Sequence, residues 1–343
     1  MKNITSYTMI YDLDKMTEKH CKIFTRVNLA FATLKNNRLI IKDEEYMKYL
    51  DQIREYNPNL EIVLSIGGAG AFGFSDMAME KSNRDIFLNS MIEMINKYDL
   101  DGIDLDWEFP TQDWGGDFSP KDKENFTILI KEMRESLDLL SQENDKKYLL
   151  TIAAAVGEWF TNSTEMGEVY KYLDEIMLMT YDLRGFGQEI TGHHTTLFSK
   201  EDDVFKTSNV VDGIKILEKE GVPKEMISIG AAMYSRGWDG VGKENHGLLQ
   251  KANPGGNISL EYPKLLHEVI ENEEYEVFFD DEAKVPWAYS KNKKEFVSFD
   301  NKESVKYKCK YVKNNNLKGI MFWRYCDWPE NDLIDAMYEE FNE

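Results

Sequence analysis

Short apolar runs of strand length recur along the chain and alternate with longer segments of helical period. Eight of these runs predict strands, at residues 4–10, 26–32, 61–66, 102–107, 149–156, 175–181, 227–233 and 319–323. Between them the helical pattern is clearest from Phe126 to Leu140, where apolar residues recur every three or four positions. Eight β/α units predict a TIM (β/α)8 barrel, whose active site lies at the carboxyl ends of its strands. A doubly wound sheet, the alternative α/β fold, predicts fewer strands and a ligand site at a switch point.

The connection after the seventh predicted strand is too long for a plain loop. It carries a helix-like stretch at 265–271 and three strand-like runs at 275–279, 285–289 and 295–299, separated by polar turns. We therefore expect residues 1–235 and 300–343 to form the barrel. Residues 236–299 are expected to form a small α+β insertion that lines the cleft at its active-site face.

The fourth predicted strand ends in the octapeptide Asp-Gly-Ile-Asp-Leu-Asp-Trp-Glu, residues 101–108. Side chains alternate along a strand, so Asp104, Asp106 and Glu108 share one face, each about 7 Å from the next. Neighbouring carboxylates raise one another's pKa, and a raised carboxyl pKa suits a general acid near neutral pH. A metal site is the weaker alternative because the chain has only 5 His. A solvated edge strand would not carry Ile103, Leu105 and Trp107 on its other face.

Charge and composition exclude several classes of function. The 343 residues carry a net charge of −21, which repels phosphate backbones and anionic lipid, so neither nucleic acid nor a membrane surface is an expected partner. No apolar run approaches the roughly 20 residues of a membrane span, and no secretory signal is visible at the amino terminus. Three scattered cysteines suit neither a disulfide framework nor a zinc site. We expect no metal, no cofactor and a monomer.

Residues 68–73 fit the Gly-x-Gly-x-x-Gly pattern of dinucleotide-binding proteins, which makes a nicotinamide oxidoreductase the second functional hypothesis. The context argues against it. The preceding strand is the third of the chain rather than the first, and the next strand bears three acids where one would suffice for a ribose hydroxyl. We interpret these glycines as permitting a tight turn beside a ligand-binding loop.

The octapeptide resembles the Asp-Gly-x-Asp-x-Asp-x-Glu signature of family 18 glycoside hydrolases, the chitinase family. Residues 65–68, 179–182, 233–238 and 321–323 resemble further motifs of that family, in the family's order. The insertion, including residues 280–286, is similar to the α+β module of the deeper-clefted chitinases. Arg184, Phe186 and Arg324 depart from the family pattern at positions where they would alter the edges of the cleft.

The resemblance implies a retaining chitinase that cleaves β-1,4 linkages in chitin or chitooligosaccharides. This family uses the acetamido oxygen of the substrate as nucleophile, so that one general acid suffices. That role falls to Glu108. Asp106 would orient the acetamido N–H, and Asp104 would share a proton with Asp106. Tyr181 would hydrogen-bond the acetamido oxygen, and Asp182 would bind near the same sugar.

Sugar faces stack on aromatic rings, so the cleft is expected to expose several of them. Trp323 would floor the subsite of the distorted sugar, with Tyr7 and Phe31 as walls. Trp114 and Tyr234 are expected toward the leaving group, and Trp287 on the other side. Met179 and Arg236 complete the predicted substrate contacts through their motifs. Trp107 is expected in the core, and adjacent His193 and His194 are interpreted as loop-packing residues rather than metal ligands.

Two alternatives remain on the same fold. Relatives that cleave the N-glycan core or peptidoglycan would make the protein an endo-β-N-acetylglucosaminidase or a glucosaminidase, although the Trp after the third Asp and the insertion favour chitin. Chitinase-like lectins keep the barrel and lose the acid, and the presence of Glu108 argues against that class. The substrate class predicts an extracellular protein or one on the cell or spore surface.

Overall fold

The computed structural model describes residues 2–113, 117–185, 187–203, 208–255, 258–326 and 332–343. Eight parallel strands in this part of the chain close into a barrel: β1 (Asn3–Met9), β2 (Arg26–Lys35), β4 (Glu61–Gly67), β5 (Gly102–Asp106), β6 (Leu149–Ala155), β7 (Glu175–Met179), β8 (Ile227–Ala232) and β13 (Gly319–Trp323). Strand β1 pairs with both β13 and β2 and thereby closes the ring. The predicted TIM barrel is confirmed.

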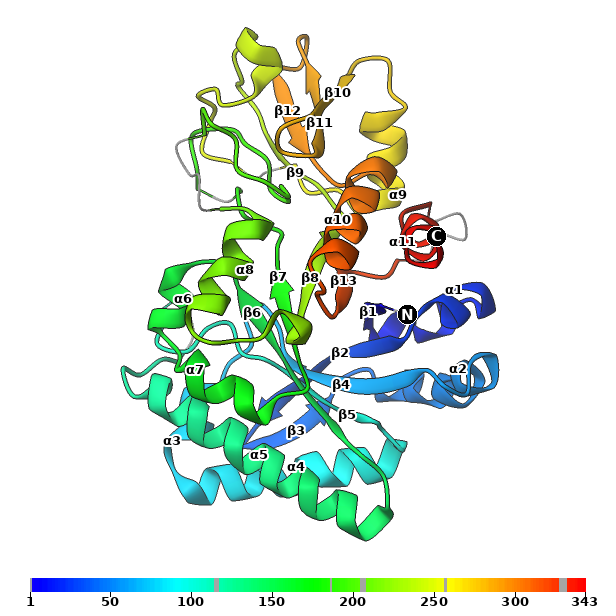
Figure 1. The fold of residues 1–343 in the computed structure, drawn as a ribbon, viewed down its shortest axis with the longest axis vertical. Helices are drawn as coiled ribbons and strands as arrows, with labels where there is room; N and C mark the ends of the chain where they lie inside the picture. The colour runs from blue at the N-terminus through cyan, green and yellow to red at the C-terminus, as the bar shows by residue number, and fades with distance from the viewer. Residues whose placement is uncertain (1, 114–116, 186, 204–207, 256–257, 327–331) are drawn as a thin grey trace.

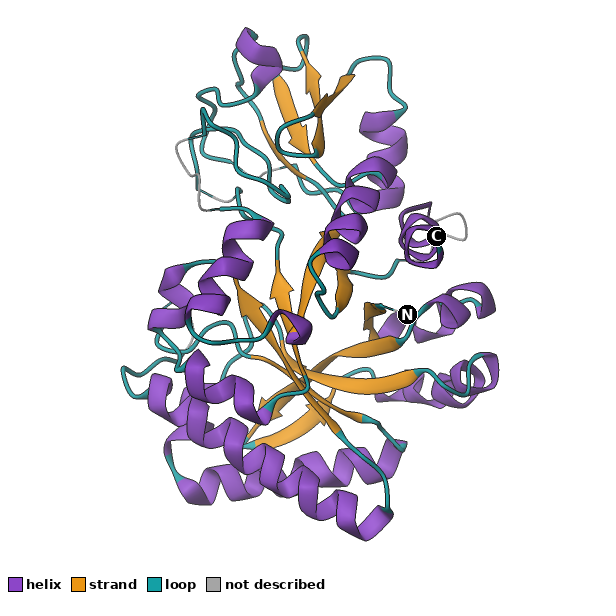
Figure 2. Ribbon diagram, viewed as in Figure 1, coloured by secondary structure: helices purple, strands orange, loops and turns teal. Residues whose placement is uncertain are grey.

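Helices cover the outside of the barrel, as Figures 1 and 2 show. They are α1 (Glu18–Ile23), α2 (Leu50–Tyr56), α3 (Phe74–Met79), α4 (Lys81–Tyr98), α5 (Asp122–Asn144), α6 (Glu158–Asn162), α7 (Met166–Val169), α8 (Val210–Lys219), α10 (Lys302–Asn314) and α11 (Asp332–Asn342). The predicted apolar stripe of α5, from Phe126 to Leu140, is buried. Because helices cover one face of each strand and the barrel interior covers the other, the strands read as nearly continuous apolar runs.

A second, antiparallel sheet lies at one end of the barrel, drawn in yellow and orange in Figure 1. Its order is β10 (Glu276–Asp280), β11 (Val285–Ser290), β12 (Glu295–Ser298) and β9 (Arg236–Trp238), beside α9 (Tyr262–Leu265) and the π-helical turn η6 (Leu266–Ile270). The sheet has an apolar core of its own, which includes Trp238, Trp287 and Phe296. The sequence had not indicated β9, nor β3 (Arg38–Ile41), which forms a hairpin with β2.

The segment after β7 joins the barrel to the insertion. The His193 Nε2 atom lies 3.2 Å from an Asp280 carboxylate oxygen, and the backbone N–H of His194 donates to the Ser298 hydroxyl at 2.9 Å. The Thr195 hydroxyl donates to Asp300 at 3.0 Å. These bonds fix the insertion beside the loop that carries the predicted Tyr181 and Asp182.

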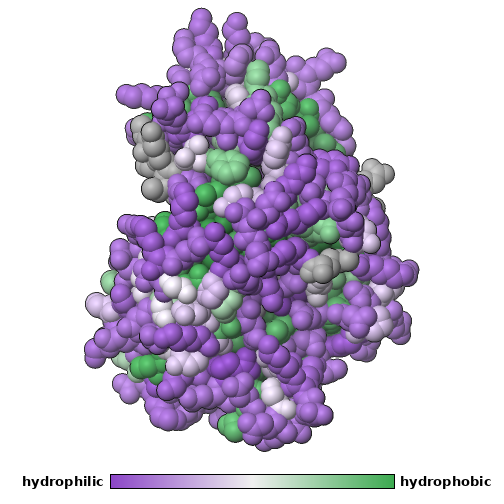
Figure 3. Space-filling model, in the orientation of Figure 1, coloured by the Kyte–Doolittle hydropathy of each residue, from purple (hydrophilic) through white to green (hydrophobic). Residues whose placement is uncertain are grey.

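The outer surface is mostly hydrophilic on the face seen in Figure 3, in keeping with the net charge of −21. Among the described residues, none of the helices combines the length and the apolar character that crossing a membrane would require.

Candidate active site

Asp104 is fully buried inside the barrel and accepts three hydrogen bonds from hydroxyl groups. The donors are Tyr7 at 2.9 Å, Ser65 at 2.7 Å and Thr151 at 2.6 Å. Burial raises the pKa of Asp104, and the three donors together with the charge of Arg26 oppose that rise. Its hydrogen bonds go to these hydroxyls, and none joins it to Asp106 among the described residues. The sharing of a proton between the two acids stays a prediction.

Asp106 is also buried, and its Oδ1 atom has no hydrogen-bond partner in the described part of the chain. Burial raises the pKa of Asp106 well above its usual range, and the negative charges of Glu108 and Asp104 add to the effect. A buried polar atom without a partner is unusual in a native protein. Asp106 therefore offers an oxygen that a ligand can engage.

Glu108 lies two residues beyond the end of β5 and is partly exposed at the mouth of the barrel. Burial raises the pKa of Glu108 to about 7, and the negative charge of Asp182 contributes. A carboxyl group with this pKa is protonated in a large fraction of molecules near neutral pH. It can therefore donate a proton and, once ionised, accept one.

Two glycines let the end of β4 approach the catalytic strand. Gly67 has φ +121°, and a Cβ atom there would lie 2.0 Å from the Asp106 carbonyl oxygen. The Gly68 N–H donates to that oxygen at 2.9 Å, and a Cβ on Gly68 would lie 2.4 Å from the Phe31 ring. The three glycines of the pattern, Gly68, Gly70 and Gly73, all have positive φ, in keeping with the expected tight turn, and Gly68 together with the preceding Gly67 also packs closely against Asp106 and Phe31.

Asp182 and Arg236 form an ion pair at the edge of the site. The guanidinium donates from Nε at 2.7 Å and from Nη2 at 2.9 Å to the two carboxylate oxygens. Burial would raise the pKa of Asp182, but the His194 imidazole and the Arg236 guanidinium outweigh it and lower the pKa to about 2. Asp182 is therefore ionised at any working pH, which explains its effect on Glu108.

Tyr181 follows the carboxyl end of β7 and is partly exposed. Its ring occupies the space left by Gly230, where a Cβ atom would come within 2.7 Å, and its hydroxyl lies 3.8 Å from the Met321 sulfur. Burial and the charge of Asp106 raise its pKa well above the usual range, so the group stays a hydroxyl that can donate. Met179 packs on the same interior cluster.

Trp323 and Phe31 form an aromatic pair at the mouth of the barrel. Their rings stack with centroids 5.5 Å apart and planes inclined by 19°, and both side chains are partly exposed. Tyr7 lies 6.0 Å from Trp323 but is only 2% exposed. Trp323 and Phe31 thus present the apolar surface on which a sugar face can stack.

Comparison with known proteins agrees with this geometry. The profile of the family described as "Glycosyl hydrolases family 18" matches residues 4–327. The chain belongs to this family. It is 35% identical over 290 residues to Chitinase A1 of Niallia circulans, a match that covers 80% of this chain and 41% of that protein. It is 30% identical over 341 residues to Chitotriosidase-1 of Mus musculus, covering 93% of this chain and 72% of that one.

Solved structures of the family resemble the whole chain. A family 18 N-acetylglucosaminidase from Paenibacillus barengoltzii has a TM-score of 0.95 and 38% identity, with 99% of this chain and 100% of that one covered. The chitinase ChiW from Paenibacillus sp. str. FPU-7 has a TM-score of 0.92 and 32% identity, and the match covers 33% of its chain. The family 18 chain thus spans less than half the length of Chitinase A1 and a third of ChiW.

Three predicted substrate contacts of this family 18 chain prove to be buried. Tyr7 is a hydroxyl donor to Asp104 rather than a wall of the cleft, because its ring is inside the barrel. The Tyr234 ring packs against Tyr181 at 6.1 Å and is likewise buried, so it offers no stacking face. Trp287 is 8% exposed and stacks on Phe278 in the core of the insertion. The sequence patterns gave no means of telling these rings from exposed ones.

Other expectations for the family 18 chain have mixed outcomes. Trp107 stacks on Phe74 at 5.4 Å in the core, as expected. Trp114 and Phe186 lie outside the described residues. Trp159, which the sequence analysis overlooked, is partly exposed after β6 and packs edge-on against Phe109, the neighbour of Glu108, at 5.0 Å. The sequence signal that could have indicated Trp159 is its position shortly after a barrel strand, at the end where the active site lies.

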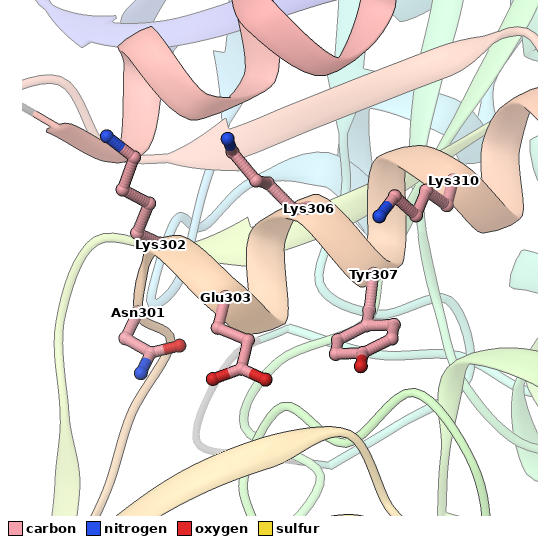
Figure 4. A pocket seen from close by; sticks show the side chains of 6 residues that line it. All are labelled: Asn301, Lys302, Glu303, Lys306, Tyr307 and Lys310. Atoms are coloured by element: carbon pink, nitrogen blue, oxygen red, sulfur yellow. The ribbon is translucent and has the colours of Figure 1, made fainter.

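A hollow of ≈ 480 Å³ lies along α10, away from the catalytic strand, and Asn301, Lys302, Glu303, Lys306, Tyr307 and Lys310 line it (Figure 4). Lys302 and Lys306 point to one side of the helix, whereas Glu303 and Tyr307 point to the other. Lys306 pairs with Glu339 of α11 at 3.0 Å. We interpret the hollow as a solvated helix surface. Among the described residues, no group of three or more His, Cys, Asp or Glu is placed to hold a metal ion.

Proposed function

We propose that the protein is a retaining chitinase that hydrolyses β-1,4 linkages between N-acetylglucosamine units, with Glu108 as general acid and base. The observation that carries the proposal is the carboxyl group of Glu108, partly exposed at the mouth of a family 18 barrel with a pKa of about 7. The names of the relatives, Chitinase A1 and Chitotriosidase-1, support chitin as the substrate class.

The surroundings of Glu108 favour a nucleophile that comes from the substrate. Asp104 is buried under three hydroxyl donors, and Asp182 is held by two bonds from Arg236. The unpartnered oxygen of Asp106 is placed to accept the acetamido N–H, so that Asp106 orients the sugar instead of attacking it. With each of these carboxyls engaged in another role, the acetamido oxygen of the sugar is the group left to attack the anomeric carbon.

In the first step Glu108 donates its proton to the glycosidic oxygen while the acetamido oxygen attacks the anomeric carbon. The bond to the leaving sugar breaks, and a cyclic oxazolinium ion forms. Asp106 accepts the acetamido N–H through its unpartnered oxygen and stabilises the positive charge, and the Tyr181 hydroxyl fixes the carbonyl oxygen. In the second step the ionised Glu108 takes a proton from water, and that water attacks the anomeric carbon as the bond between this carbon and the acetamido oxygen breaks, which restores the acetamido group and retains the configuration.

A second candidate keeps this chemistry and changes the product. The N-acetylglucosaminidase from Paenibacillus barengoltzii matches this chain over its whole length at 38% identity, which favours release of single N-acetylglucosamine units as the alternative. Cleavage of the N-glycan core or of peptidoglycan is the third alternative on the same barrel. Because chitin is an insoluble polymer, the proposal includes action outside the cell or at the cell or spore surface.

Fluorogenic glycosides of N-acetylglucosamine, chitobiose and chitotriose, together with chitin, test the proposal. The wild type is expected to turn over the chitobiose or chitotriose glycoside with retention of configuration. Glu108→Gln is expected to lose several orders of magnitude in kcat while still binding the oligosaccharide. Preference for the single-sugar glycoside would favour the exo-acting alternative.

Glu158→Gln is the matched control, because Glu158 lies after β6 at the same end of the barrel and pairs with Lys219 on the surface. It should retain wild-type activity. Binding of chitooligosaccharides without turnover would replace the proposal with a lectin. Absence of both binding and turnover would direct attention to N-glycans and peptidoglycan.

A further inference from the structure

Two adjacent buried histidines of the segment after β7 face in different directions. His193 faces the insertion, where its Nε2 lies 3.2 Å from Asp280 and its ring contacts Trp287. His194 faces the active site. Its ring lies 5.3 Å from that of Tyr234, and its Nδ1 lies 3.8 Å from the Oδ1 atom of Asp182.

Hydrogen bonds fix the backbone at His194, whereas its imidazole nitrogens make none within the described part of the chain. Its N–H bonds Ser298, and the next residue, Thr195, bonds Asp300 and accepts a bond from Lys308 at 2.5 Å. Neither ring nitrogen has a hydrogen-bond partner among the described residues, although the side chain is fully buried. Such a group normally finds a partner, and the nearest carboxylate is Asp182.

The charges around His194 come in two pairs. Asp182 pairs with Arg236, and Asp300 pairs with Lys308 at 2.6 Å. The ring of Tyr234, a further titratable residue, lies 5.3 Å from the imidazole ring. Burial lowers the pKa of His194 against the pull of Asp182, so the imidazole is neutral where Glu108 titrates. A neutral tautomer with its proton on Nδ1 presents one N–H donor to Asp182.

We infer that His194 is a positioning residue that, together with Arg236, fixes the Asp182 carboxylate in the place from which it acts on Glu108. The separation of 3.8 Å exceeds a hydrogen bond by less than 1 Å. Hydrogen bonds in active sites are often long without substrate and shorten to normal hydrogen-bonding distance once substrate binds. The inference rests on the proposed function, because it assigns Glu108 as the acid that Asp182 influences.

The consequence is a defined change in pH dependence. Asp182 raises the pKa of Glu108 through its negative charge, although its side chain is 43% exposed. Without the imidazole donor, Arg236 alone holds the carboxylate, which can then move further into solvent and away from Glu108. Glu108 then gives up its proton at a lower pH. The limb of the kcat profile on which activity falls with rising pH should therefore move to lower pH.

The test compares His194→Leu, which keeps the volume and removes the donor, with His194→Asn, which keeps an N–H near the place of Nδ1. His193→Leu is the matched control, since it removes a buried imidazole from the neighbouring position without touching Asp182. We expect His194→Leu to shift the alkaline limb down by about 0.5 to 1 pH unit, which is part of the effect of one nearby charge. His194→Asn and His193→Leu should keep the wild-type limb, whatever they cost in Tm.

A second measurement makes the inference independent of turnover. Carbon-13 NMR of glutamate labelled at the side-chain carboxyl can follow the titration of Glu108, which the Glu108→Gln spectrum identifies. The same downward shift is expected in His194→Leu. An unshifted Glu108 titration in folded His194→Leu, or an equal shift in His193→Leu, would overturn the inference. A wild type that titrates as described but hydrolyses no substrate would overturn the proposed function instead.

Discussion

The mouth of the barrel and the core of the insertion are both buried and rich in aromatic side chains, but they differ in how their polar atoms are satisfied. In the insertion each buried tryptophan has a partner: Trp238 donates to the Gln188 carbonyl at 2.9 Å and Trp287 to the His246 carbonyl at 3.1 Å. At the mouth of the barrel the Asp106 Oδ1 atom, the Tyr234 hydroxyl and both ring nitrogens of His194 have none among the described residues.

The difference separates a structural region from one that a ligand completes. A buried polar group left without a hydrogen bond costs about 1–3 kcal/mol, so a cluster of them persists in a native fold when function requires it. The tryptophans of the insertion carry no such cost because their N–H groups are hydrogen-bonded. We therefore conclude that Trp287 stabilises the fold and does not bind substrate. The barrel mouth carries this cost at Asp106, which would hold the acetamido group of the sugar, and at Tyr234 and His194 beside it.

Trp287→Ala should have the largest effect, on stability. Removing a buried tryptophan costs about 3–5 kcal/mol, so the unfolding transition that reports the insertion should move to markedly lower temperature. The kcat for a chitobiose glycoside, measured well below that transition, should change little. Trp323→Ala is the counterpart and should lose activity with a smaller change in Tm. If Trp287→Ala instead lowered kcat at unchanged stability, Trp287 would line the cleft after all.

In contrast to Trp287→Ala, Asp106→Asn should lower kcat without lowering stability. Loss of a charge that stabilises the transition state lowers kcat by about 10²- to 10³-fold. The Tm should stay the same or rise, because the substitution removes repulsion with Glu108 and Asp104. Asp101→Asn is the control on the same segment: its carboxylate accepts the Ile62 N–H at 2.7 Å, so it should cost stability and spare kcat. An Asp106→Asn enzyme with unchanged kcat would refute the role of Asp106.

The sequence indicated the barrel strands and the catalytic carboxylates because burial on two faces and three acids on one face leave clear patterns. It could not indicate which aromatic rings are exposed. All six residues of β11 are buried, so alternation along that strand carries no information about Trp287. Strands as short as β9 are below the length at which periodicity is visible. The different directions of His193 and His194 depend on the loop after β7, whose conformation follows from its bonds to the insertion.

Glu108 should make the wild type less stable as the pH rises. Its pKa rises from 4.5 in the unfolded chain to about 7 in the folded one, so the native state binds more protons between these values and stability falls across that window. This pKa shift corresponds to a loss of about 3 kcal/mol in the free energy of unfolding across the window. Glu108→Gln lacks this proton, so its Tm relative to wild type should be higher at pH 8 than at pH 4.5. An equal difference at both pH values would contradict the raised pKa.

Gly68→Ala should have the smallest effect and probes how the site is supported. Gly68 has φ +85°, and a Cβ there would lie 2.4 Å from the far edge of the Phe31 ring, which must move away from its stacked position on Trp323. We expect KM for chitotriose glycosides to rise several-fold, about 1 kcal/mol, at nearly constant kcat, because binding to the aromatic pair weakens while Glu108 is untouched. Gly70→Ala separates this from backbone strain, because Gly70 has φ +77° and nothing within 4 Å of its added Cβ. Equal KM values in the two variants would mean that the Phe31–Trp323 pair does not contribute to binding, and that the barrel mouth recognises the sugar through its polar groups alone.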